Sequence, residues 1–79
     1  MLPVIMYTTP TCGFCRLAKR FFEKYGVPFV EKDVARDEAA RYEMFQKTSQ
    51  MGVPVFEVGD AIIVGFYEAK LRELLGIPV

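Results

Sequence analysis

The two cysteines of this chain, Cys12 and Cys15, stand where one apolar pattern gives way to another. The run before them, residues 4–7, is apolar and carries β-branched residues, which is typical of a central strand buried on both faces. After them, apolar residues recur every three to four positions among charged ones, which predicts an amphipathic helix over residues 14–25. A Cys-x-x-Cys pair between a strand and a helix is typical of a redox site.

The remaining sequence divides into short elements with short connections. Gly26 and Pro28 end the first helix. We expect a strand over 28–34, a helix from Asp37 to about Thr48, two strands over 55–58 and 61–64 around a turn at Gly59, and a last helix from about residue 67 to 75. The order β-α-β-α-β-β-α predicts a parallel strand pair extended by an antiparallel hairpin. This is an α/β, thioredoxin-fold arrangement: a four-stranded mixed sheet flanked by three helices, in one domain over residues 1–79.

Several apolar side chains are assigned to the interior from their spacing. These are Phe14 and Leu17 on the first helix, Phe29 and Val30 on the second strand, and Ala40, Met44 and Phe45 on the second helix. Phe66 and Tyr67 are adjacent, so both cannot face inward, and we expect one of them to be exposed. The residue that caps the second helix is not evident, because Ala35 and Arg36 are poor caps.

Composition excludes several classes of protein. Ten basic and ten acidic residues give a net charge of zero, which favours neither nucleic acid nor an anionic membrane. No apolar run reaches the roughly 20 residues of a membrane span. The N-terminal stretch, residues 1–4, shows no signal-peptide pattern. We therefore expect a monomeric cytoplasmic protein, in a compartment that keeps its thiols mostly reduced.

The cysteines are too close in sequence to close a stabilising loop, so chemistry explains them better than stability does. Histidine is absent, which excludes a Cys-His nucleophile pair and any histidine metal ligand. A zinc site would need four ligands, and the chain offers two sulfurs. Two readings stay open beside redox chemistry: a pair of buried, inert cysteines, and a metal-binding loop like that of copper chaperones, whose strand order differs.

In a redox site the two sulfurs would have different roles. Cys12 lies at the helix N-terminus, where the helix dipole favours a thiolate, so we expect a lowered pKa and a nucleophilic sulfur, with help from Arg16 and Lys19 if they reach back. Cys15 falls one turn inside, beside the apolar stripe, where desolvation keeps it a thiol until Cys12 is in a mixed disulfide. Cys15 would then resolve that intermediate.

Pro54 is the second informative residue. It follows Val53 and opens a strand, a position where the missing N–H of proline is tolerated. If the bond before it is cis, Val53 can offer its backbone to a peptide-like substrate as a short added strand. An ordinary trans proline at the start of a strand stays open from the local sequence. Three aromatic residues are predicted to belong either to the core or to an apolar rim near the site: Phe14, Phe66 and Tyr67.

Three motifs in the expected order resemble the glutaredoxin family: Tyr7–Cys15, Gly52-Val53-Pro54 and Val64-Gly65-Phe66. The resemblance covers nearly the whole chain. It implies a thioredoxin fold, dithiol–disulfide exchange, a cis bond at Pro54 and a nucleophile at Cys12.

The chain departs from glutathione-using glutaredoxins at the positions that hold glutathione. They carry lysine where Thr9 stands, proline and tyrosine at Gly13 and Phe14, and threonine at Gly52. Those proteins also carry a Gly-Gly pair and an Asp-Asp pair near the last strand. In this chain only Gly65 and Glu68 correspond to members of these pairs. The Gly-Phe pair after the last strand is similar to the NrdH-redoxins, which take electrons from thioredoxin reductase.

The sequence thus predicts a glutaredoxin-like protein disulfide reductase with Cys12 and Cys15 as its dithiol. The residues expected to contact substrate are Thr11, Gly13, Phe14, Val53, Pro54, Gly65 and Phe66. No tightly bound cofactor or metal is expected, and glutathione is at most a weak co-substrate. Disulfide-containing proteins are the expected substrates, and a thioredoxin-reductase-type flavoenzyme the expected donor. The alternatives are a glutathione-dependent glutaredoxin and a metal or iron–sulfur carrier.

Overall fold

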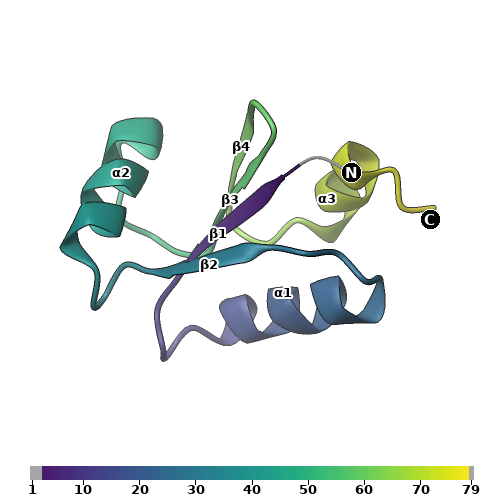
Figure 1. Cartoon of the computed structure of the whole chain (residues 1–79), viewed down its shortest axis with the longest axis horizontal. Coiled ribbons are helices and arrows are strands. Elements are labelled where there is room, and N and C mark those ends of the chain that lie inside the picture. Colours follow the sequence, from purple (N-terminus) through teal and green to yellow (C-terminus); the bar gives the residue numbers. More distant parts are fainter. Residues whose placement is uncertain (1–2, 79) are drawn as a thin grey trace.

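The computed structural model describes residues 3–78. Outside the described residues lie Val79 and also Met1 and Leu2, which belong to the stretch without a signal-peptide pattern. Its elements follow the order β-α-β-α-β-β-α (Figure 1). Their bounds are β1 Val4–Thr8, α1 Gly13–Lys24, β2 Val30–Asp33, α2 Glu38–Thr48, β3 Val55–Val58, β4 Ala61–Val64 and α3 Glu68–Leu75. The predicted thioredoxin-fold arrangement is confirmed.

The sheet has the strand order β2-β1-β3-β4. β1 runs parallel to β2, with Ile5 opposite Val30, and antiparallel to β3, with Met6 opposite Phe56. β3 and β4 form the predicted antiparallel hairpin, and Gly59 takes a positive φ of 58° in its turn. Since β1 and β2 end at the same edge of the sheet and β3 begins there, this edge collects the β1–α1 loop and the start of β3.

Alternate side chains of β1 enter two separate cores. Val4 and Met6 join the core beneath α1 and α3, together with Phe22, Phe56 and Leu71. Tyr7 points to the opposite face, where it packs with Val34, Ala40, Met44 and Val55 under α2. Figure 1 shows α1 and α2 on opposite sides of the sheet. The two-residue alternation of a strand therefore distributes β1 between both layers.

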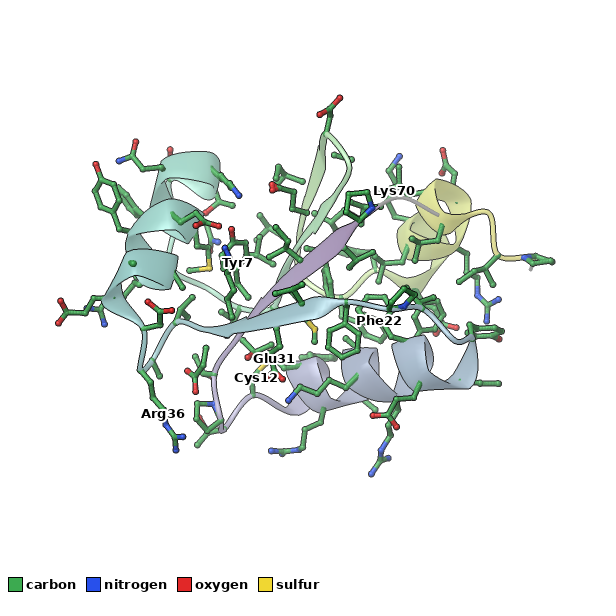
Figure 2. The ribbon with its side chains drawn as sticks, in the orientation of Figure 1. Tyr7, Cys12, Phe22, Glu31, Arg36 and Lys70 are labelled. Carbon is green, nitrogen blue, oxygen red and sulfur yellow. The ribbon has the colours of Figure 1, made fainter. Side chains whose placement is uncertain are left out.

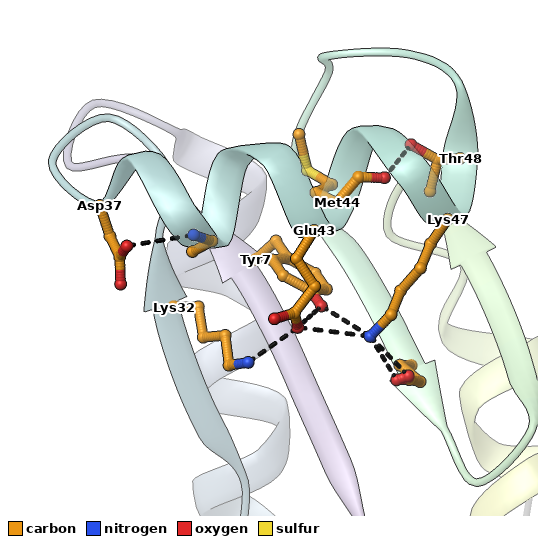
Figure 3. Close-up of polar contacts among 9 residues, drawn as sticks. Tyr7, Lys32, Asp37, Glu43, Met44, Lys47 and Thr48 are labelled. Atoms are coloured by element: carbon orange, nitrogen blue, oxygen red, sulfur yellow. Dashed lines mark hydrogen bonds and ion pairs between the residues drawn. The ribbon is translucent and has the colours of Figure 1, made fainter.

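Ion pairs and a phenol join α2 to the sheet (Figure 3). The hydroxyl of the fully buried Tyr7 donates to Glu43, and Lys47 Nζ lies 2.9 Å from the same hydroxyl. Lys32 of β2 pairs with Glu43 at 2.7 Å, and Lys47 pairs with Glu57 of β3 at 2.8 Å. We call these five residues the Tyr7 cluster. It ties α2 to β1, β2 and β3 at once.

Both ends of α2 are capped by short-range contacts. The Asp37 carboxylate accepts the Ala40 N–H at 3.0 Å, so Asp37 is the cap that the sequence left unassigned, and the helix begins one residue later than predicted. At the other end Ser49 is left-handed, with φ 55°, and its N–H donates to the Phe45 carbonyl at 2.7 Å.

Four side chains assigned to the interior are exposed instead: Phe14 (63%), Leu17 (46%), Val30 (57%) and Phe45 (45%). The buried residues of α1 are Cys15, Ala18, Phe21 and Phe22, so near the start of the helix the buried face is centred on Cys15 and Ala18, and Phe14 and Leu17 lie at its flank. Val30 lies on the edge strand β2, on the face that α2 covers only around Tyr7 and Val34. The other members of the predicted interior, including Phe29, pack as expected.

Candidate active site

The cysteines lie at the sheet edge where β1 hands over to α1. The Cys12 N–H donates to the Thr9 carbonyl at 3.3 Å, which closes a turn through Pro10 and Thr11. Figure 2 shows Cys12 at the start of α1, with Glu31 of β2 above the same end of the helix. Both cysteines are free, Cys12 half-exposed and Cys15 buried. The reactive end of the molecule is thus built from one loop and one helix terminus.

Cys12 is the N-cap residue of α1. Its backbone is extended, with φ −85° and ψ 113°, and its Sγ accepts the Cys15 N–H at 3.1 Å. An N-cap side chain that accepts a backbone N–H satisfies one of the unpaired donors of the first helical turn. The positive end of the helix dipole and this N–H are both directed at the Cys12 sulfur.

Cys15 occupies the opposite kind of environment. It is only 1% exposed, and burial, followed by its hydrogen-bonded contact with Cys12, raises the pKa of its thiol to about 12. The Thr9 backbone and the Lys19 ammonium act on this pKa in the opposite direction. The two sulfurs of one motif are therefore placed in contrasting surroundings, one accessible at a helix end and one enclosed in the core.

A polar pair lies between the start of α1 and β2. Lys19 Nζ and Glu31 Oε2 are 2.6 Å apart, and the buried Thr8 hydroxyl donates to the same carboxylate oxygen at 2.8 Å. Burial alone would raise the pKa of Glu31, but the hydrogen bonds from Lys19 and Thr8 lower it. Lys19 is thus held by Glu31, and its charge acts on Cys15. Arg16 folds toward the first turn, with one guanidinium nitrogen 4.0 Å from where a Cβ on Gly13 would stand.

The start of β3 forms the other wall of the site. The Val53–Pro54 peptide bond is cis, as the family resemblance implies, and the Pro54 carbonyl accepts the Gly65 N–H at 2.8 Å. Among residues 3–78, no hydrogen-bond partner is found for the Val53 backbone. Gly65 has φ +99°, and a Cβ there would meet the Tyr67 ring at 3.0 Å. A side chain at this position would therefore be strained and crowded.

The structure brings most of the predicted substrate-contact residues into one cleft of about 280 Å³, lined by Phe14, Val53, Pro54, Gly65, Phe66 and Tyr67. Gly13 lines a neighbouring hollow with Phe14 and Leu17. Thr11 is exposed in the loop and lines neither.

Sequence reasoning leaves one of the lining residues, Leu17, out of the site and gives Tyr67 as either a core residue or part of an apolar rim. Tyr67 is 62% exposed, while the rings of Phe66 and Phe21 form a T-shaped pair, so the expectation that one of the residues Phe66 and Tyr67 is exposed is confirmed. The exposure of Tyr67 can be predicted because it is adjacent to Phe66 and both cannot face inward. The helical spacing of Leu17, in contrast, predicts an interior position for it.

Residues 3–78 hold no cluster of three or more His, Cys, Asp or Glu side chains arranged to bind a metal ion. No helix within the same residues combines the length and apolar character needed to cross a bilayer.

The chain is similar in sequence and in fold to known proteins. The glutaredoxin family model matches residues 4–63. The chain belongs to the glutaredoxin family. It is 39% identical over 70 residues to a glutaredoxin-like 8.6 kDa protein of Clostridium pasteurianum, covering 89% of this chain and 93% of that protein. Among solved structures it resembles a thioredoxin-like protein, with a TM-score of 0.90 and 29% identity over 95% of this chain and 96% of the other.

A second solved structure with a similar fold is also described as glutaredoxin-like. NrdH-redoxin from Escherichia coli, described as a glutaredoxin-like protein with a thioredoxin-like activity profile, has a TM-score of 0.80 and 27% identity, covering 92% of this chain and 95% of that one. This glutaredoxin is accordingly a thiol–disulfide oxidoreductase with one cysteine pair.

Proposed function

We propose that this glutaredoxin reduces disulfides in other proteins, with Cys12 as nucleophile and Cys15 as resolving thiol. One observation carries the assignment: Cys12 is the accessible N-cap of α1, and its sulfur accepts the Cys15 N–H, while Cys15 itself is enclosed. The alternative of two inert buried cysteines does not fit a half-exposed sulfur at a helix end. The free dithiol suits a reducing compartment such as the cytoplasm.

The reaction proceeds in two exchanges. The Cys12 thiolate attacks one sulfur of the target disulfide; the new S–S bond joins Cys12 to the target, and the second target sulfur leaves and takes up a proton. Cys15 then loses its proton and attacks Cys12, which releases the first target sulfur as a thiol and leaves a Cys12–Cys15 disulfide. Two electrons have passed to the target, and a donor must return them.

The cleft beside Cys12 suits a peptide better than a small charged thiol. Val53 offers an unpaired backbone N–H and C=O at the start of β3, so an extended target segment could pair there as an added strand. Around it, exposed Phe14 and Tyr67 supply apolar and aromatic contact area. Such rings contribute strongly to protein interfaces.

We further propose that the electron donor is a thioredoxin-reductase-type flavoenzyme, with glutathione a poor substitute. The glutathione site of the family relies on charges, and here Thr9 and Tyr67 carry none. Glu68, the remaining acid at the amino end of that site, is held by Arg72 at 2.9 Å. Each lost charge-assisted hydrogen bond costs about 1.5–3 kcal/mol, so glutathione should bind roughly a hundredfold more weakly, or worse, than to a complete site.

The sulfur roles are tested by trapping. Cys15→Ser should accumulate a mixed disulfide between Cys12 and a protein disulfide substrate such as insulin, because the thiol that releases the target is missing. Cys12→Ser is the matched control and should trap nothing. In the wild type, iodoacetamide should modify Cys12 well before Cys15, as read by peptide mass spectrometry. Equal trapping by the two variants, or faster alkylation of Cys15, would show that the roles are misassigned.

The donor is tested by offering the oxidised protein either glutathione or a bacterial thioredoxin reductase with NADPH. We expect rapid NADPH consumption with the flavoenzyme and slow reduction by glutathione. The double variant Thr9→Lys, Tyr67→Asp should speed the glutathione reaction by restoring charge. Efficient glutathione-dependent turnover by the wild type would instead assign it to the glutathione-using glutaredoxins.

A further inference from the structure

Three exposed cations stand in line along the outer surface of α1: Arg16, Arg20 and Lys24. Residues four apart on a helix lie on the same side, so the three side chains form one stripe. Within residues 3–78 none of them lies within 4 Å of a carboxylate. The other basic residues all do: Lys19, Lys32, Arg36, Arg41, Lys47, Lys70 and Arg72. Within residues 3–78, the basic side chains without a carboxylate partner are thus gathered on one helix.

The stripe borders an apolar trough that begins at the active site. The cleft beside Val53 shares Phe14 with the hollow at Gly13, and that hollow shares Leu17 with a groove of about 320 Å³ between α1 and α3. Phe66 lines both the cleft and the groove. Arg20 and Lys24 line the far part of the groove. We call this continuous surface, from Phe14 through Leu17 and Phe66 to Arg20 and Lys24, the α1 trough.

The acids near the trough do not cancel its charge. Glu68 lines the groove, but its carboxylate is paired with Arg72. Glu23 is the acid of α1 itself, and it is not among the residues that line the groove. A segment lying in the α1 trough would therefore meet apolar side chains near Cys12 and two unpaired cations farther along.

We propose that the α1 trough docks the disulfide-containing target protein. The target would bind through a segment that is apolar beside its reacting disulfide and acidic farther away. This rests on the proposed function, because the disulfide must reach Cys12. A helix rises 1.5 Å per residue, so Arg20 and Lys24 lie about 12 and 18 Å along the axis from Cys12. An extended chain advances about 3.3 Å per residue, so the acidic side chains belong about four to six residues from the reacting cysteine.

The size of the effect follows from its exposure to solvent. Single ion pairs at a surface contribute modestly, but complementary fields also raise the rate of encounter. Two such pairs together should change the second-order rate by about threefold to tenfold at low salt. The effect should fade in about 0.5 M NaCl, where the Debye length is only a few ångströms.

The test uses synthetic peptides with an internal Cys-Gly-Gly-Cys disulfide, one adjacent phenylalanine, and a tail on either side. Positions four to six from the nearer cysteine are glutamate, glutamine or lysine. Oxidation of the reduced protein is followed by acid quench, alkylation and mass spectrometry. We expect the glutamate peptide to react fastest and the lysine peptide slowest, for the tail direction that fits the trough.

Paired variants give the control. Arg20→Gln with Lys24→Gln should bring the rates of the glutamate, glutamine and lysine peptides together. Arg36→Gln with Lys70→Gln removes the same charge from exposed positions elsewhere and should preserve the order. Equal wild-type rates for glutamate and glutamine peptides with both tail directions, or convergence in the control variant, would overturn the docking proposal and leave the proposed function intact. Failure of the wild type to reduce any peptide would overturn both.

Discussion

On the face of the sheet covered by α1 and α3, aromatic rings meet in a nearly continuous array, whereas the face covered by α2 holds a phenol among four charges. Phe22 lies 5.1 Å from Phe29 and 5.8 Å from Phe56, ring centroid to ring centroid. Opposite them, the Tyr7 cluster joins α2 to three strands. Apolar packing depends little on pH or salt, but ion pairs depend on both. The two layers should therefore respond to different perturbations.

The difference also separates stability from reactivity. Cys15 is buried on α1 on the same side as Ala18 and Phe22, which belong to the aromatic layer, so the reacting end of the molecule lies on the face of the sheet opposite the Tyr7 cluster. α2 buries only Ala40 and Met44, and its position depends more on polar contacts. Loss of the Tyr7 cluster should loosen α2 before it affects the cysteine pair.

The largest effect should come from breaking the aromatic layer. Phe22→Ala removes a fully buried ring and leaves a cavity, at a cost of about 3–5 kcal/mol in the free energy of unfolding. Urea denaturation measures this, and Phe22→Leu, which costs less, serves if the alanine variant does not fold. Phe14→Ala, at an exposed ring of the same helix, should cost less than about 0.5 kcal/mol. Similar losses for Phe22 and Phe14 would contradict the layer assignment.

An intermediate effect is expected from the buried phenol. Tyr7→Phe keeps the ring but removes the hydroxyl that contacts Glu43 and Lys47, so we expect a loss of about 1–2 kcal/mol by the same denaturation. Hydrogen exchange should accelerate in α2 more than in α1. Tyr42→Phe, at an exposed position of α2, is the matched control and should be nearly neutral. Faster exchange throughout the chain would mean that the cluster does not act locally.

The smallest effect concerns pH. Hydrogen bonds from Lys32 and Tyr7 lower the pKa of Glu43 from 4.5 to about 2. A folded-state pKa below the unfolded one contributes stability above the unfolded value and loses it as pH falls toward the folded value. Glu43→Gln should therefore be less stable than wild type at pH 7, by about 1 kcal/mol or less for such partly exposed pairs. Between pH 5 and 2 the gap should close; a constant gap would show that the charge of Glu43 is not involved.

The order of elements and the position of the site follow from local signals in the sequence. Periodicity separates strands from helices, Gly59 marks the hairpin, and Pro54 opens β3 where the resemblance places it. These features depend on residues close together in the chain. The Asp37 cap is equally local, although the two residues before it, Ala35 and Arg36, are poor caps.

What sequence could not predict depends on distant partners. The Tyr7 cluster unites residues up to 50 positions apart, such as Tyr7 and Glu57, and an alternating pattern cannot show which charge meets which. Phe14 and Leu17 obey the helical spacing and yet are exposed, because spacing gives the approximate side of a helix but not which neighbouring elements cover it. These two exposed side chains line the substrate cleft and the hollow beside it.

Cys12 is the N-cap of α1 and also carries the proposed attacking sulfur. Different residue types are best suited to these two roles. Serine is among the strongest N-caps, so Cys12→Ser should hold the helix at least as well while abolishing exchange. At this position the chain gives up a better helix terminus in order to keep a reactive one. Each turnover also joins this N-cap sulfur to Cys15, so the redox state of the pair and the stability of the first turn of α1 are thermodynamically linked.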